Sequence, residues 1–178
     1  MYFHVKISIM IKATAKLIVA LNGNAKKTQI AAGFAWGLLL GLIPMGVFFI
    51  VLFLCSFFFM HNHGAKIFGM AIIKLLSPVY VYWLDSLGGF ILTIDSLQQI
   101  FTTMYNMPFV PWTKFNNTLV MGGLAAGFAL WIPAFVLFII LIPLYRNNVA
   151  PKIRDSKIAN KIVKFPLFAL LDKAIKDY

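Results

Sequence analysis

The sequence contains no glutamate, and its acidic side chains amount to five aspartates in 178 residues. Charged residues of both signs make up 12% of the chain, against about 25% in an average soluble domain. Hydrophobic residues make up 61%. A chain with so little charge cannot cover a globule with polar surface in water. The composition therefore predicts one compact unit embedded in a lipid bilayer.

The scarcity of acids also limits catalysis, because general acid–base chemistry needs paired groups within hydrogen-bond reach. The sequence lacks a phosphate-binding loop, a serine-nucleophile motif and a zinc-protease motif. The lone Cys55 excludes an internal disulfide. His61 and His63 are two ligands without a third nearby, which predicts a solvated turn rather than a metal site. We expect no enzyme activity, no metal and no cofactor.

Basic residues gather at the two ends of the chain. Residues 1–27 hold five lysines and no acid, and residues 146–178 hold eight basic residues and three acids. Basic flanks favour the cytoplasmic side of a membrane, so both termini are expected in the cytoplasm of a bacterium, with the protein in its inner membrane. No soluble domain is present to bind nucleic acid, and none is predicted as a partner.

Both ends are also amphipathic. In residues 1–29 the apolar side chains fall on one face of a helix and lysines lie around the other, until Asn22-Gly23-Asn24 ends the pattern. The tail 146–178 has a similar character and is broken at Pro166. We expect both segments on the cytoplasmic surface, in contact with membrane lipid.

The membrane domain, 30–145, contains three apolar segments, at 30–60, 65–94 and 119–145. The linker 95–118 between the last two is polar and aromatic, and is expected to form a periplasmic loop at headgroup level. The predicted fold is an all-α integral membrane protein. The linker residues expected to face a partner are Tyr105, Asn106, Pro108, Trp112, Asn116 and Asn117.

Three simple spans would place the termini on opposite sides, which contradicts the charge pattern. Pro44-Met45-Gly46 divides segment 30–60 into two pieces of 14 residues each. Each piece is only about 21 Å long as a helix, too short for a hydrocarbon core of about 30 Å. A re-entrant hairpin that opens to the cytoplasm solves the problem. The alternative is one long helix, kinked at Pro44, with the odd span lost elsewhere.

Glycine spacing predicts close helix packing. Gly33, Gly37 and Gly41 share one helix face, and Gly123 and Gly127 repeat the spacing. The pentapeptide AAGFA occurs twice, at 31–35 and 125–129, either by chance or as an inverted repeat whose copies run antiparallel. The positions expected to hinge or break the helices are Pro44, Gly46, Ser77, Pro78 and Pro133.

Lys74 and Asp85 cannot both avoid the membrane if 65–94 spans it. An ionisable residue at depth is costly and points to function. In a continuous helix the two lie about 16 Å apart along the axis, too far to pair unless the chain breaks at Ser77-Pro78. The structural alternative is that Lys74 reaches toward the surface and Asp85 binds loose backbone near Gly88-Gly89.

GFAWGLLLGLIP at 33–44 and LLSPVYVYWLDSLGG at 75–89 resemble the bacterial membrane family called domain of unknown function 2062. The chain departs from that pattern at Ser77, where asparagine is commoner. Residues 20–44 and 104–123, with the KFNNT stretch at 114–118, resemble a subfamily of small proteins. The resemblance assigns no catalytic residues. It implies a larger envelope-spanning protein, related to bridge-like lipid-transport proteins, as a neighbour and partner.

Three functions remain. The first is an accessory or scaffold subunit of a cell-envelope assembly for phospholipid transport. The second is a small transporter or channel that uses broken helices and the Lys74 and Asp85 charges. The third is a membrane enzyme, for which His61, His63 and Asp85 are the available acid–base groups. The first is favoured, and oligomerisation is left open.

Overall fold

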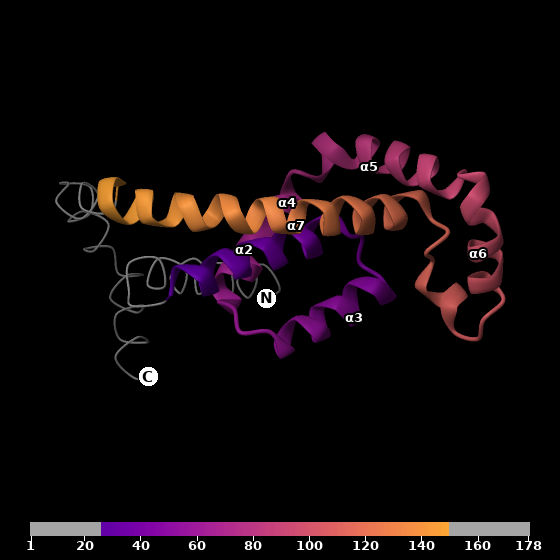
Figure 1. Cartoon of the computed structure of the whole chain (residues 1–178), viewed down its shortest axis with the longest axis horizontal. Helices are drawn as coiled ribbons and strands as arrows, with labels where there is room; N and C mark the ends of the chain where they lie inside the picture. The colour runs from indigo at the N-terminus through magenta and orange to yellow at the C-terminus, as the bar shows by residue number, and fades with distance from the viewer. Residues whose placement is uncertain (1–25, 150–178) are drawn as a thin grey trace, which may run out of the picture.

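The computed structural model describes residues 26–149, and this part of the chain is helical, with no strand. The all-α prediction is confirmed there. The expected amphipathic helix at the N-terminus and the tail beyond residue 149 lie outside the described residues. The elements are α2 (Lys27–Leu42), α3 (Val47–Cys55), η1 (Ser56–Phe58), α4 (His63–Leu75), α5 (Ser77–Leu92), α6 (Asp95–Tyr105), η2 (Val110–Thr113), α7 (Thr118–Leu144) and η3 (Tyr145–Val149) (Figure 1).

The chain reverses direction between α2 and α3, at the predicted break. Proline disfavours helical backbone in the preceding residue, and Ile43 before Pro44 is extended, with ψ 130°. α3 begins only after Gly46 and leads the chain back, until the amide of Asn62 donates to the carbonyl of Gln29 at 2.9 Å. The two ends of this hairpin therefore lie together. One long helix kinked at Pro44, the alternative considered above, is not formed.

α4 runs parallel to α2 and packs against its glycine face. A Cβ atom at Gly37 would lie 2.6 Å from the carbonyl oxygen of Lys66, and one at Gly41 would lie 2.5 Å from Cβ of Ile73. One at Gly33 would overlap the carbonyl oxygen of Asn62. The three glycines that share a face in the sequence thus let two helix backbones meet without side chains between them.

α7 runs antiparallel to α2 on another side. Ile142, near its end, packs with Ile30 near the start of α2, while a Cβ atom at Gly123 would lie 2.8 Å from the carbonyl oxygen of Leu42. The two AAGFA copies are antiparallel but do not face each other, because Phe34 of the first stacks on Phe138 at 4.3 Å. α7 also continues as a helix through Pro133, so the second copy is not followed by a break as the first is.

Segment 65–94, expected as one span, is two helices. α4 and α5 meet at Leu76 with a bend of 83°, and Pro78 sits in the first turn of α5, where a proline amide is not needed. After the bend, α5 runs antiparallel along α7 (Figure 1). Gly88 and Gly122 lie at this crossing, and a Cβ atom on either would overlap backbone of the other helix.

The linker 95–118 was expected as a loop, but it contains an amphipathic helix. α6 starts directly after α5 and turns across the start of α7, at Thr118 (Figure 1). The chain then returns through η2, and Phe115 is buried against Phe101 of α6 at 6.2 Å between ring centroids. Asn117 caps α7 by accepting from the amide of Val120 at 3.2 Å.

Within residues 26–149, one continuous helix, at 118–148, is long and apolar enough to cross a membrane, and the bent α4–α5 pair would be a second span if it counts as one. α2 is nearly all buried between its neighbours. α3, α5 and α7 instead expose valine, leucine, isoleucine and phenylalanine side chains along their outer faces. The core thus lies around α2, and the surface around it is apolar.

Candidate functional site

The broken end of α2 is the first polar site in the described part of the chain. The last carbonyls of any helix lack intrahelical donors, and here the extended Ile43 leaves them facing α4. The Lys74 ammonium donates to the carbonyl of Ile43 at 2.8 Å and to that of Gly41 at 3.4 Å. The Tyr80 hydroxyl lies 2.9 Å from the Ile73 carbonyl and 3.2 Å from that of Gly41.

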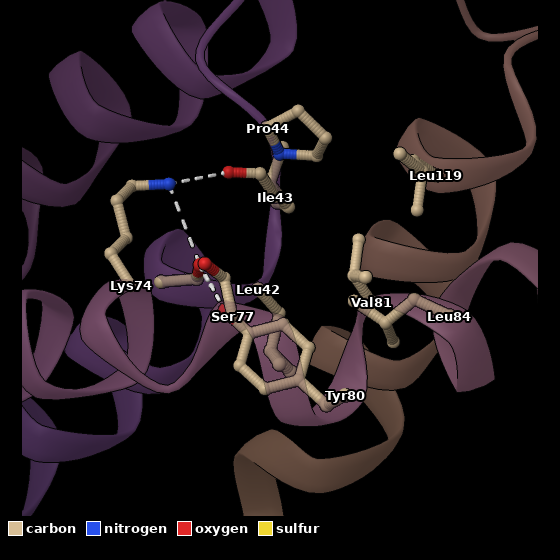
Figure 2. Close-up of a pocket in the computed structure, with 10 residues that line it drawn as sticks. Leu42, Ile43, Pro44, Lys74, Ser77, Tyr80, Val81, Leu84 and Leu119 are labelled. Carbon is tan, nitrogen blue, oxygen red and sulfur yellow. Dashed lines mark hydrogen bonds between the residues drawn. The ribbon is translucent and has the colours of Figure 1, made fainter.

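These groups border an open pocket of about 260 Å³ (Figure 2). Lys74 approaches it from α4 and Tyr80 from α5, which the bend at Leu76 brings to the same side of α2. A cation at a helix C-terminus is favourable, because the aligned peptide dipoles leave negative charge there. The lining residues are Gly41, Leu42, Ile43, Pro44, Lys74, Ser77, Tyr80, Val81, Leu84 and Leu119.

Asp85 lies apart from this pocket. It is exposed on α5, and its carboxylate accepts a short hydrogen bond from the Thr118 hydroxyl at the start of α7. The break before Ser77 therefore does not bring Lys74 and Asp85 together. Each is satisfied by a different partner, and the structure gives no shared ionic site for the two.

Lys66 is the centre of a second polar site, close to the turn that holds His61 and His63. Its side chain is completely buried, and its ammonium donates to the Ser56 hydroxyl at 2.7 Å. The ammonium also lies over the rings of Phe53, at 4.5 Å from the centroid, and Phe57, at 4.2 Å. Aromatic faces attract cations, so η1 and the end of α3 form a partial cage around this charge.

His61 lies beside this cage and is 8% exposed. Its Nδ1 lies 2.8 Å from the carbonyl of Phe59, so Nδ1 carries the proton that is donated. Nε2 is buried and has no hydrogen-bond partner. Burial first, and then the nearby Lys66 ammonium, lower the pKa of His61 to about 4, so the ring is neutral at pH 7.

His63 is exposed at the start of α4, with its ring centroid 4.6 Å from that of His61. The two histidines are adjacent in space as in sequence. Among residues 26–149, no group of three or more histidine, cysteine or acidic residues is placed to hold a metal ion.

The residues predicted to face a partner are gathered at the start of α7, where α6 and η2 lie. Tyr105, Asn106 and Asn116 line an open pocket of about 300 Å³ together with Phe101 and Phe115. Trp112 is 71% exposed, and it meets Phe109 edge-to-face at 5.4 Å. Pro108 is exposed beside them, while Asn117 serves as the helix cap described above.

Three features were not found by sequence reasoning. Lys66 was missed because its burial depends on Ser56 and Phe53, which belong to the preceding segments η1 and α3. The contact between Gly88 and Gly122 was missed because the two glycines lie on different helices. Glycine spacing within one helix does not show such a contact. Tyr80 was missed because one partner, the Gly41 carbonyl, lies far away in sequence on α2, and the other, on Ile73, lies across the bend at Leu76.

The sequence is similar to known proteins over most of its length. A relative described as an uncharacterized protein of Treponema pallidum (strain Nichols) is 31% identical over 159 residues, which cover 89% of this chain and 98% of the relative. No solved structure is significantly similar. The family model described as "Uncharacterized protein conserved in bacteria (DUF2062)" matches residues 11–149. The chain therefore belongs to the bacterial family called domain of unknown function 2062, as its motifs predicted.

Proposed function

We propose that this chain is a multi-pass protein of the bacterial inner membrane that acts as a non-catalytic accessory subunit of a cell-envelope assembly for phospholipid transport. The observation that carries the proposal is the combination of a glycine-packed helical core with an apolar outer surface. The implied partner is a larger envelope-spanning protein. It would contact the end of the molecule that α6 and η2 form, which we call the aromatic end.

Membrane embedding is supported by the outward faces of the helices. α3 has no buried residue, although all nine of its residues are apolar. Water would leave these side chains exposed at a cost of about 25 cal/mol per Å² of apolar surface, whereas lipid removes the cost. The 27-residue α7 is about 40 Å long, enough to cross a hydrocarbon core of about 30 Å.

The proposed topology is supported by the hairpin and the charges. Because Asn62 meets Gln29, the hairpin returns to the side from which α2 starts. Irregular backbone is tolerated inside a membrane where its polar groups find partners, and Lys74 donates to the Ile43 carbonyl there, while Met45 and Gly46 are exposed. A re-entrant hairpin that opens to the basic, cytoplasmic end would leave both termini in the cytoplasm.

The geometry gives less support to a transporter or channel. Gly33 and Gly37 bring α2 against α4, and Gly123 and Gly127 bring α7 against α2, so these helices pack closely. Lys74 neutralises the end of α2, and Asp85 binds Thr118 elsewhere. The enzyme alternative lacks its acid–base set as well, because Asp85 does not lie beside His61 and His63. A packing role fits these contacts better.

The proposed partner surface is tested by copurification. Trp112→Ala removes an exposed aromatic side chain from the η2 end, while Trp83→Ala removes one that is equally exposed, at 71%, from the outer face of α5. We expect the wild type and Trp83→Ala to recover a protein long enough to cross the periplasm, identified by mass spectrometry after crosslinking. Trp112→Ala should lose most of this recovery, because exposed aromatic residues dominate many interfaces.

The result that contradicts the proposal is a wild-type chain, extracted in mild detergent, that crosslinks to no envelope protein. Equal recovery with both tryptophan variants would exclude the η2 end as the contact surface.

A further inference from the structure

The end of the molecule at which the hairpin closes is basic and contains no carboxylate among the described residues. Lys66, His61 and His63 lie there, beside the start of α2 with Lys26 and Lys27. The two aspartates in residues 26–149 lie elsewhere, since Asp85 contacts Thr118 and Asp95 starts α6. Among the described residues, the buried Lys66 charge therefore has no acidic side chain beside it.

Lys66 can donate three hydrogen bonds, and the described residues accept one of them, at Ser56. The rings of Phe53 and Phe57 attract the charge but accept no conventional hydrogen bond. Burial of an unpaired ammonium is costly, and the cost is lowered when an anion is present. This half of the site is thus suited to an anionic oxygen.

His61 needs a hydrogen-bond donor, whereas Lys66 needs an acceptor. Because Nδ1 donates to the Phe59 carbonyl, Nε2 of the neutral ring is a hydrogen-bond acceptor, and it is buried without a donor. A ligand that fits both halves must offer an anionic oxygen to Lys66 and a hydroxyl to His61. A singly protonated phosphate monoester has both groups, and with a second pKa of about 6 it is a common species near neutral pH.

We propose that Lys66 and His61, with His63 at the rim, form a binding site for a phosphate monoester. In this site the anionic oxygen of the phosphate would accept from the Lys66 ammonium, and its hydroxyl would donate to Nε2 of His61. His63 can supply a further hydrogen bond from the exposed side. A phosphodiester fits less well, because its phosphate has no hydroxyl to donate.

Phe57 covers the site and is 54% exposed, with its ring 5.0 Å from that of His63. The Lys66 side chain is completely buried, so this ring would have to move for a ligand to reach it. The neighbouring Phe58 and Met60 are almost fully exposed, so the acyl chains of a phosphatidic acid have apolar surface beside the phosphate. The ligand is therefore either that lipid or free phosphate. The lipid choice rests on the membrane embedding proposed above, and the phosphate chemistry does not.

Binding is measured on the purified full-length chain in detergent micelles at pH 6.5, without any partner. The probes are phosphatidic acid, phosphatidylglycerol as the diester, and inorganic phosphate, with thermal unfolding and native mass spectrometry as readouts. We expect phosphatidic acid to bind the wild type about tenfold more tightly than phosphatidylglycerol, because a hydrogen bond in a buried site contributes roughly a factor of ten. Lys66→Met should weaken phosphatidic acid about tenfold or more, while Lys114→Met, which removes an exposed lysine, should not.

Two further variants keep the test decisive if Lys66→Met fails to fold. Lys66→Arg keeps the charge and should keep binding. His61→Phe keeps an aromatic ring but removes the acceptor, and should abolish the preference for phosphatidic acid over phosphatidylglycerol. Competition by inorganic phosphate at similar affinity assigns the site to free phosphate, whereas a large gain from the acyl chains assigns it to the lipid.

The proposal is overturned if neither phosphatidic acid nor inorganic phosphate binds the wild type. It is equally overturned if Lys66→Met binds like the wild type, or if the diester binds as tightly as the monoester. None of these results depends on copurification, so failure of the accessory-subunit proposal is seen separately.

Discussion

Gly88 of α5 and Gly122 of α7 lie where two helix backbones touch. A Cβ atom on Gly88 would overlap the Thr118 carbonyl, while one on the adjacent Gly89 would lie 3.8 Å from the nearest atom, Cγ2 of Thr118. The two neighbours thus differ completely in the space around them. Sequence spacing alone could not tell them apart, because the difference depends on how α5 is rotated against α7.

Gly88→Ala is expected to push α5 and α7 apart and lower stability by about 1–3 kcal/mol, the usual cost of overpacking. Gly89→Ala is the matched control. It should leave stability unchanged or raise it by up to about 1 kcal/mol, because alanine is the better helix former. Thermal unfolding of both variants in the same detergent measures the difference. Equal melting temperatures would mean that the two helices are not in backbone contact at Gly88.

Single residues were predicted where their role is local and missed where it is tertiary. Gly33, Gly37 and Gly41 were placed on one packing face because helix periodicity fixes their relation. Lys66 was not singled out, because its burial depends on Ser56 and Phe53 across the turn. No window of sequence contains that information.

Helix ends in this fold are built by neighbouring helices. The Pro44 break could be predicted from the sequence, because proline ends a helix by steric and hydrogen-bond effects within a few residues. A break near Leu76 was predicted as one alternative. Its angle of 83° could not be predicted, because it depends on how α5 packs along α7. Pro133 carries the same local signal as Pro44, yet α7 continues through it.

Lys74→Met is expected to destabilise the broken end of α2. The variant keeps the length of the side chain but removes the donor, so the Ile43 carbonyl is left unpaired in an apolar setting and Gly41 keeps only Tyr80. An unsatisfied buried acceptor costs about 1–3 kcal/mol. Denaturant unfolding in micelles measures the loss against Lys114→Met, which removes an exposed lysine. If the two variants unfold alike, Lys74 does not hold the end of α2.

Taken as a whole, the described chain has a basic end and an aromatic end, which lie at opposite ends of α7. The closing end of the hairpin contacts the final turns of α7 through Ile30 and Ile142. α6 and η2 lie at the start of α7. The number of membrane crossings was predicted from the apolar segments, the Pro44 break and the terminal charges, and it depends on the surrounding bilayer as well as on the fold.

Cysteine labelling in intact cells tests this arrangement. In a Cys55→Ser background, single cysteines replace Lys26, His63 and Thr103, which are all exposed. We expect a membrane-impermeant maleimide to reach position 103 from the periplasm. Positions 26 and 63 should be labelled only after the inner membrane is opened, because Asn62 is hydrogen-bonded beside Gln29. Labelling of position 63 from the periplasm would refute the re-entrant hairpin.

The proline within α7 has a consequence for assembly. Pro133 has no amide hydrogen, so the carbonyl four residues earlier, at Ala129, loses the donor that a regular helix would give it. Both residues are exposed on the outer side of α7. A carbonyl in hydrocarbon without a donor costs several kcal/mol. If α7 crosses the bilayer as proposed, a serine or threonine hydroxyl from a neighbouring helix at this depth would remove the cost.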